Sequence, residues 1–400
     1  MSIKYPLSTL PFDEKEFKAV IKTFKSGKIS QGPKVKEFEK KFAMKMGVKY
    51  GIAVNSGSSA NLIVLDALIK INNLKKGDEV IIPASTFATV AMPIIQVGLK
   101  PVYVDINFRN LNLDEKELLK AINKKTKIIM MVHTLGNCYG IDKIKKIANK
   151  KKLILFEDCC EAHGSILNKK KVGSWGDISA FSFFVAHNMT TGEGGMILTN
   201  NKKIMNLCKS LREFGRIEQN FNKSNRYYSD KNIKNYDKRY LFNNIGYNVR
   251  MNDISASIGL EQLKKLDRNN KIRIKNAKYI FKILKKYHNK KIYLPSMKFD
   301  GTNVFYTFPI ILLSPKTHLF RKKLCQYLES KNIETRPMMA GCLPDQPAFF
   351  NKPGKIIGKL KDSRFVKDNL FFVGIHPSLT KKHLDYFIKH FEYFLNKKFV

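Results

Sequence analysis

The fold of this chain is decided by one stretch near its middle. It reads Phe181-Ser182-Phe183-Phe184-Val185-Ala186-His187-Asn188-Met189-Thr190-Thr191-Gly192-Glu193-Gly194-Gly195. An apolar run, Ile178–Phe183, leads into the stretch, and a glycine-rich turn ends it, where backbone can approach a flat ligand closely. Between the two lies His187, whose imidazole can accept and donate protons near neutral pH. A lone histidine is usually structural, so its role depends on the rest of the chain.

Outward from this stretch, apolar runs alternate with helical segments in both directions. The runs are short and rich in Val, Ile and Phe, and they are Tyr50–Asn55, Glu79–Pro83, Pro101–Val104, Lys127–Val132, Lys152–Phe156, Ile178–Phe183 and Met196–Thr199. Strands of this kind, spaced by helices, indicate an α/β fold with a mostly parallel sheet covered on both faces.

The chain is expected to divide after residue 252. Residues 1–252 would form a large domain that includes the N-terminal helices, the first of them with Asp13 as its N-cap. Residues 253–400 would begin with one or two long helices and continue as a smaller α+β domain. The polar segment 217–235, rich in Asn and Lys, is predicted to be a loop.

Basic residues exceed acidic residues by a wide margin. The chain has 73 Lys and Arg against 33 Asp and Glu, a formal net charge of +40. The lysines are scattered over polar faces of helical segments such as Asp142–Lys152, which indicates a solvated surface rather than a nucleic-acid groove. A phosphorylated small molecule would account equally well for part of the charge. We therefore expect no nucleic-acid partner.

Several features bear on the compartment. The six cysteines lack the spacing of a disulfide scaffold, and the first residues lack the apolar core of a signal peptide. The segment Val80–Leu99 is uncharged and long enough to cross a bilayer. Because it contains Pro83, Pro93 and several polar residues, it is predicted to be a buried strand, a turn and a buried helix. We expect a soluble, cytoplasmic protein with no membrane partner.

Two further motifs lie where strands are expected to end. The turn Asn55–Asn61 consists of small residues between a strand and a helix, and such turns aim backbone N–H groups at an anion. Many similar turns bind nothing. The run Leu153–Asp158 ends in two carboxylates at the edge where ligands bind in open α/β sheets. Asp158 could keep a pyridine nitrogen protonated, or it could cap a helix that starts at Cys159.

These motifs, in this order, resemble the DegT/DnrJ/EryC1/StrS family of sugar aminotransferases. The resemblance runs nearly end to end and rests on residues 30–33, 38–39, 55–60, 157–158, 173–177, 181–183, 193–195, 246–251 and 262–263. It implies the fold type I architecture of pyridoxal-phosphate-dependent enzymes, with a large domain and a smaller C-terminal α+β domain. It also implies pyridoxal or pyridoxamine 5′-phosphate as the cofactor, and a homodimer whose active site is shared.

The resemblance assigns four residues to the cofactor phosphate. Gly57, Ser58 and Ser182 would hold it within one subunit, and Asn248 would reach in from the second subunit.

The same resemblance assigns residues to the cofactor ring and to the substrate. Asp158 would pair with the pyridine nitrogen, and Phe87 would stack on the ring. Glu161, where many relatives have glutamine, would lie near the ring hydroxyl. Arg250 and Arg336 are candidates for contacts with an anionic substrate or amino donor, and equally for structural ion pairs.

His187 stands where aminotransferases of the family carry the lysine that binds the cofactor covalently. Imidazole cannot form that bond, and in this respect the chain resembles the family's 3-dehydratases, as do residues 236–240 and 333–337. The resemblance implies a cofactor held non-covalently and a nucleotide-linked 4-keto-6-deoxyhexose as substrate, with GDP-4-keto-6-deoxy-D-mannose expected. His187 would serve as base and then acid while the C3 hydroxyl leaves, which predicts a pKa near the working pH.

The remaining expectations concern the product, the amino donor and the rivals. The product would be a 4-keto-3,6-dideoxy sugar for lipopolysaccharide O-antigen, and L-glutamate would regenerate pyridoxamine phosphate. An iron–sulfur 3-dehydratase uses a C-x-C pair that this chain lacks, so we expect no iron–sulfur cluster and no metal. Two alternatives stay open. One is a nucleotide-sugar aminotransferase, although no lysine lies between Lys171 and Lys202; the other is a catalytically inactive homologue.

Overall fold

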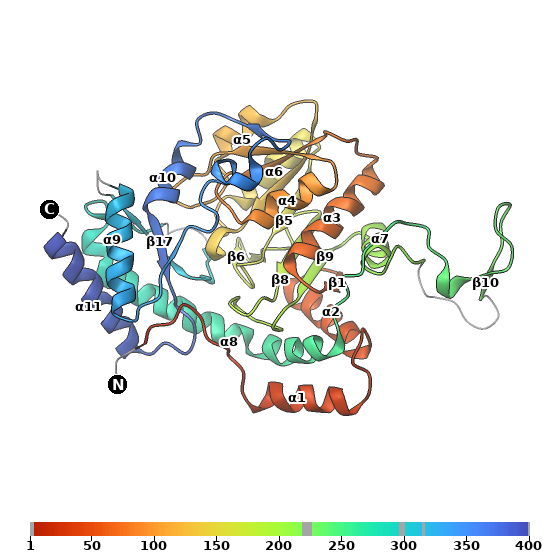
Figure 1. Ribbon diagram of the computed structural model, residues 1–400, viewed down its shortest axis with the longest axis horizontal. Helices are drawn as coiled ribbons and strands as arrows, with labels where there is room; N and C mark the ends of the chain where they lie inside the picture. The colour runs from red at the N-terminus through yellow and green to blue at the C-terminus, as the bar shows by residue number, and fades with distance from the viewer. Residues whose placement is uncertain (1–3, 218–225, 296–300, 314–316, 399–400) are drawn as a thin grey trace.

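The computed structural model describes residues 4–217, 226–295, 301–313 and 317–398. Its central sheet has the strand order β1-β9-β8-β5-β4-β2-β3-β16 (Figure 1). In that order the strands are Tyr50–Val54, Gly195–Thr199, Ile178–Ser182, Ile154–Asp158, Thr126–Val132, Glu79–Pro83, Lys100–Val104 and Lys355–Ile356. Strand β9 pairs antiparallel with β1 and β8, and the other pairings are parallel. The predicted mostly parallel sheet is confirmed, and β16 is an addition that the sequence did not indicate.

Both faces of the sheet are covered by helices because side chains alternate along each strand. On β4, Ile129 and Met131 belong to one hydrophobic cluster, and Ile128 and Met130 belong to the other. Helices that contribute to the first cluster are α2 (Pro33–Met46), α5 (Glu115–Ala121), α6 (Ile141–Lys151) and α8 (Asp253–Leu284). Helices that contribute to the second are α3 (Gly57–Asn72), α4 (Ala88–Gln96) and α7 (Lys202–Arg212).

The helix signals at the N-terminus are confirmed. Asp13 caps α1 (Glu14–Lys25) with a complete capping box, in which the Glu16 side chain accepts a hydrogen bond from the Asp13 backbone N–H. Helix α2 begins at Pro33 after the break at Gly32. Its free N-terminal amides are taken up by Asp253, whose carboxylate accepts from the backbone N–H groups of Gly32, Lys34 and Val35. The start of α8 is thereby fixed to the start of α2.

The C-terminal part is an α+β arrangement, as expected. The region predicted to hold one or two long helices is the single helix α8. After it, a second sheet has the order β12-β14-β17-β15, with strands Ile292–Tyr293, Phe308–Leu312, Leu370–Val373 and Arg336–Pro337. The helices of this part are α9 (Thr317–Ser330), α10 (Lys361–Asn369) and α11 (Lys381–Lys398). The domain boundary after residue 252 stays a prediction.

The N-terminal segment packs with this C-terminal part. Tyr5 is fully buried in the same hydrophobic cluster as residues of α8 and α11. Its hydroxyl donates to the carbonyl oxygen of Gly374 at 2.7 Å, and its backbone N–H donates to that of Asn332. The first residues of the chain therefore complete a core built mainly by the last hundred.

Two small sheets lie outside the layers already described. One joins β13 (Gly301–Thr302), β6 (Ile166–Leu167) and β7 (Lys170–Lys171). The other is the hairpin of β10 (Tyr227–Tyr228) and β11 (Tyr236–Asp237), which projects from the body of the molecule beyond α7 (Figure 1). The predicted loop 217–235 thus contains a short strand, and its residues 218–225 lie outside the described residues. In the described part of the chain, no helix has the length and apolarity needed to span a membrane.

Candidate active site

A cavity of about 290 Å³ opens where strands β4, β5 and β8 end and helix α3 begins. This is the carboxyl edge of the parallel strands, where ligands bind in open α/β sheets. The residues that line it are Ser56, Gly57, Ser58, Thr86, Phe87, Thr89, Val90, Val132, His133, Thr134, Asp158, Cys160, Glu161, Ser182, Phe184, His187, Glu193, Tyr306 and Met339. The structure therefore brings together seven of the predicted site residues, namely Gly57, Ser58, Phe87, Asp158, Glu161, Ser182 and His187.

Helix α3 points its N-terminus into this cavity. Ser56 is the N-cap and accepts a hydrogen bond from the Ser59 backbone N–H. Gly57 follows at a point of close approach, because a Cβ there would lie 2.6 Å from Cβ of Ser182 and 3.1 Å from Sγ of Cys160. Unpaired amides and the positive end of the helix macrodipole favour an anion at this position.

Asp158 ends strand β5 with both carboxylate oxygens satisfied. Oδ2 accepts from Nδ2 of Asn61 at 2.9 Å, and Oδ1 accepts from the Cys160 backbone N–H at 3.1 Å. Hydrogen bonds donated to a carboxylate favour its charged form. The alternative role as a helix cap is wrong, because a turn and not a helix follows at Cys159.

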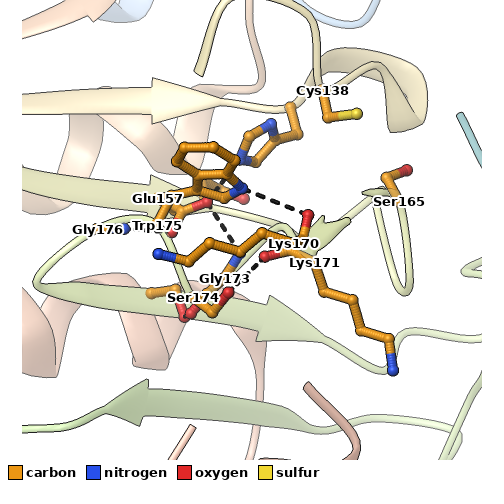
Figure 2. A network of polar contacts seen from close by, with 12 residues as sticks. Cys138, Glu157, Ser165, Lys170, Lys171, Gly173, Ser174, Trp175 and Gly176 are labelled. Carbon is orange, nitrogen blue, oxygen red and sulfur yellow. Dashed lines mark hydrogen bonds and ion pairs between the residues drawn. The ribbon is translucent and has the colours of Figure 1, made fainter. Parts of the chain in front are cut away.

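Glu157 has a different task from its neighbour, because adjacent residues of a strand face opposite sides. It is fully buried and accepts from the backbone N–H groups of Gly173 at 2.8 Å and Gly176 at 2.6 Å. His133 Nε2 also lies 2.9 Å from this carboxylate. Figure 2 shows Glu157 reaching toward the turn that carries these glycines and Trp175. Glu157 thus holds a turn in place, while Asp158 faces the cavity.

His187 presents one ring nitrogen to the cavity. Its Nδ1 lies 3.1 Å from the carbonyl oxygen of Ser182, and it donates there because a carbonyl oxygen only accepts. The ring is walled by Tyr306, Phe184 and His163, with centroid separations of 5.4, 6.0 and 6.1 Å. Nε2 therefore carries the lone pair and can act as a base.

Burial sets the protonation of His187. Its pKa is lowered from the ordinary 6.5 to about 4, chiefly by removal from bulk water; the Ser182 carbonyl opposes this shift and the nearby Arg273 cation adds to it. The expectation of a pKa near the working pH is therefore wrong for the ligand-free protein. The imidazole is neutral at neutral pH, and this favours its function as a base.

Glu161 is held from one side. Its Oε2 accepts from the Leu135 backbone N–H at 2.6 Å. The pKa of the Glu161 carboxyl is raised to about 8. Burial is the main cause; the hydrogen bond from the Leu135 N–H opposes the shift, and the nearby Asp158 adds to it. The cavity thus contains one carboxyl group with a hydrogen-bond donor on each oxygen, Asp158, and one whose charged form is disfavoured, Glu161.

Tyr306 is a cavity residue that the sequence analysis did not identify. It lies two residues before strand β14, which begins at Phe308. Phe305 before it takes a left-handed backbone conformation, with φ of 50°, which turns the chain toward the cavity. Arg273 of α8 donates to the Tyr306 carbonyl oxygen at 2.9 Å. No periodicity in the sequence signals this turn.

Three predicted residues lie away from the cavity within the single chain. Asn248 is exposed, and its Oδ1 accepts from Nη2 of Arg250 at 3.1 Å. Arg250 also faces Glu213 at 3.4 Å and lies 5.0 Å over the Phe214 ring, so within the chain it is a structural ion pair. Arg336 is exposed and donates to the Thr335 carbonyl oxygen. Their roles toward ligands stay predictions.

This geometry agrees with comparisons to known proteins. Residues 11–392 match the DegT/DnrJ/EryC1/StrS aminotransferase family. The chain belongs to this family. GDP-4-keto-6-deoxy-D-mannose 3-dehydratase of Escherichia coli O55:H7 is 35% identical over 389 residues, which cover 96% of this chain and 98% of that protein.

Solved structures of family members give the same picture. That of the E. coli GDP-4-keto-6-deoxy-D-mannose-3-dehydratase with bound hydrated PLP has a TM-score of 0.89 and 34% identity, and the match covers 98% of this chain and 100% of that one. A GDP-4-keto-6-deoxymannose-3-dehydratase with a trapped PLP-glutamate geminal diamine has a TM-score of 0.88 and 33% identity, covering 97% and 100%. The fold type I architecture expected for this family member is confirmed.

Proposed function

We propose that this family member is a 3-dehydratase that uses pyridoxamine phosphate to remove the C3 hydroxyl of GDP-4-keto-6-deoxy-D-mannose. The feature that carries the proposal is His187, which by the resemblance to the family stands where its aminotransferases carry the covalent lysine, and which lines the cavity with Nδ1 engaged by the Ser182 carbonyl. The relatives named for this reaction cover nearly the whole chain. L-Glutamate is the proposed amino donor, as the glutamate adduct in a solved relative supports.

The residues of the cavity fit the cofactor. The N-terminus of α3, with Ser58 and Ser182, offers donors to a phosphate. The Asp158 carboxylate, oriented by Asn61 and the Cys160 backbone N–H, offers an acceptor to a protonated pyridine nitrogen. Phe87 lines the cavity with its side chain 55% exposed, which leaves a ring face free for stacking. When bound, the cofactor supplies a protonated ring that withdraws electrons from the reacting carbons.

His187 moves the proton. Its Nε2, neutral because of burial, accepts a proton at the start of the elimination. The imidazolium is held by the Ser182 carbonyl and returns the proton to the C3 hydroxyl oxygen, which leaves as water. Because the lowered pKa makes the imidazolium a strong acid, the second transfer is favourable. Walls formed by Tyr306 and Phe184 limit access of other water.

The proposal extends to assembly and location. A homodimer is proposed in which Asn248 of each chain reaches the cofactor phosphate of the other; the exposure of Asn248 in the single chain supports this. The division into domains 1–252 and 253–400 is retained as a proposal, with α8 as the first element of the second. The protein is proposed to act in the cytoplasm.

Mass spectrometry of the product tests the reaction. The protein is incubated with GDP-4-keto-6-deoxymannose, pyridoxamine phosphate and glutamate, with the His187→Asn variant as matched control. A product lighter by one oxygen, with 2-oxoglutarate released and neither seen in the variant, supports the proposal. An amino sugar as product would overturn it in favour of a transaminase, and unchanged substrate despite bound cofactor would reject this sugar.

A further inference from the structure

Two carboxyl groups face the same cavity in unequal surroundings. Asp158 accepts one hydrogen bond on each oxygen, from Asn61 and from the Cys160 backbone. Glu161 accepts one hydrogen bond, on Oε2, and its Oε1 has no hydrogen-bond partner among the described residues. Two nearby carboxylates repel each other, and the one that accepts fewer hydrogen bonds, Glu161, is the one that retains its proton.

Glu161 and Tyr306 are fastened to the same residue. The N–H of Leu135 donates to Glu161 Oε2 at 2.6 Å, and the carbonyl oxygen of Leu135 accepts from the Tyr306 backbone N–H at 3.1 Å. Leu135 is left-handed, with φ of 53°, a conformation that is uncommon for a branched side chain. The neighbouring Gly136 leaves no room for a side chain, since a Cβ there would lie 2.9 Å from the Phe305 backbone nitrogen. This turn fixes one oxygen of Glu161 and leaves the other to the cavity.

None of the described charged or titratable side chains that line the cavity around Glu161 is a lysine or arginine that could pair with its carboxylate. Those that line the cavity are His133, Asp158, Cys160, His187, Glu193 and Tyr306. Arg273 and Arg336 act on Tyr306, whose phenol pKa is raised by burial and by Glu161 and lowered by the two guanidinium groups. No salt bridge joins Glu161 to a basic residue of the described chain.

From this geometry we propose that Glu161 is a protonated carboxylic acid in the working protein and donates a hydrogen bond to the ring oxygen of the bound cofactor. Oε2 remains the acceptor for Leu135, and the proton is on Oε1, the oxygen left free toward the cavity. The inference rests on the proposed use of pyridoxal or pyridoxamine phosphate. It gives the two carboxyl groups opposite tasks. Asp158 accepts a hydrogen bond from the cofactor, and neutral Glu161 donates one to it.

Glu161→Gln tests the proton, because glutamine keeps an oxygen for Leu135 and carries a permanent N–H donor. Binding of pyridoxal phosphate is followed by absorbance from pH 6 to pH 9.5, with Glu193→Gln, a second carboxyl of the same cavity, as control. Relative to Glu161→Gln, the wild type and the control are expected to lose affinity above about pH 8, approaching tenfold per pH unit for one proton. Affinity of Glu161→Gln at pH 7 is expected within about threefold of wild type. A loss beyond about tenfold at pH 7, or a slope like that of the wild type, overturns the proposal.

Thermal unfolding of the ligand-free protein separates this inference from the proposed function. A carboxyl whose pKa is raised on folding stabilises the fold below its unfolded pKa, and that stability is lost as pH rises toward the folded pKa, here about 8. The stability of Glu161→Gln relative to wild type should therefore rise from about pH 4.5 to pH 8. A constant difference overturns the proton assignment. Absence of cofactor binding with a rising difference would instead reject the proposed function alone.

Discussion

The imidazole of His187 is oriented by the main chain of Ser182, the residue that ends the strand leading to it. Nδ1 of His187 lies 3.1 Å from the Ser182 carbonyl oxygen, while the Ser182 side chain lines the same cavity. One strand end thus serves two purposes, since it carries a hydroxyl group suited to a phosphate and fixes which ring nitrogen of the histidine is free.

Lysine at position 187 should restore a covalent tether. In His187→Lys, dehydration is expected to be lost, because the acid–base group is gone, and pyridoxal phosphate is expected to bind covalently to the new amine. Borohydride reduction followed by peptide mapping would locate the added mass at residue 187. The wild type treated in parallel should show no addition in that peptide. An unchanged cofactor absorbance in the variant would contradict the placement of residue 187.

The fall of kcat/KM on the acid side of its pH profile should occur at an unusually low pH. Because the pKa of His187 is lowered to about 4, its base form is already dominant at pH 5.5, so kcat/KM should change little between pH 5.5 and pH 7. Activity then falls as the pH approaches 4 and the imidazole becomes protonated. Steady-state kinetics, with circular dichroism at each pH to verify folding, checks this. An acid limb centred near pH 6.5 would show that burial does not control this group.

Gly57→Ala should impair cofactor binding more than folding. The added Cβ would lie 2.6 Å from the Cβ of Ser182, which must shift at a cost of about 1–3 kcal/mol. We expect cofactor affinity to fall by about tenfold or more, measured by absorbance titration. Ser58→Ala, which removes a hydroxyl group without adding volume, is the comparison. Equal affinity for Gly57→Ala and wild type would mean that the phosphate binds elsewhere.

Tyr306 should affect the substrate through its hydroxyl group and the histidine through its ring. In Tyr306→Phe, stability is expected within about 0.5 kcal/mol of wild type, because the hydroxyl has no hydrogen-bond partner in the described chain. Loss of one hydrogen bond to the sugar should raise KM by about fivefold to tenfold. Tyr306→Ala also removes the ring that meets His187 edge-on at 5.4 Å, and should lower kcat. Kinetics identical to wild type for both variants would exclude the residue from the site.

Much of the fold could be predicted because its signals are local. Runs of Val, Ile and Phe of five to seven residues, such as Thr126–Val132, are buried on both faces and so show as continuous apolar segments. The cap at Asp13 is likewise set by neighbours in sequence. The rule that ligands bind at the carboxyl ends of strands indicated Asp158 as a site residue, whereas Ser182 came from the resemblance to the family; both residues line the cavity.

What could not be predicted depends on contacts between distant segments. Tyr306 reaches the cavity through the left-handed turn at Phe305 and the carbonyl of Leu135, and neither leaves a trace in the local pattern. The low pKa of His187 results from burial under residues far away in sequence. Arg250 was left open between ligand contact and ion pair; the fold pairs it with the distant Glu213, and its role toward a ligand stays a prediction.

The hydrogen bond from Tyr5 to Gly374 has a consequence for how the protein is made. The two residues are 369 positions apart, and a ribosome adds about 5–20 residues each second. Tyr5 therefore leaves the ribosome on the order of 20 to 75 seconds before its partner exists. During that interval Tyr5 of the nascent chain lacks the residues that bury it in the finished fold. The core that contains Tyr5 can therefore form only after residues as late as Leu395 have been synthesised.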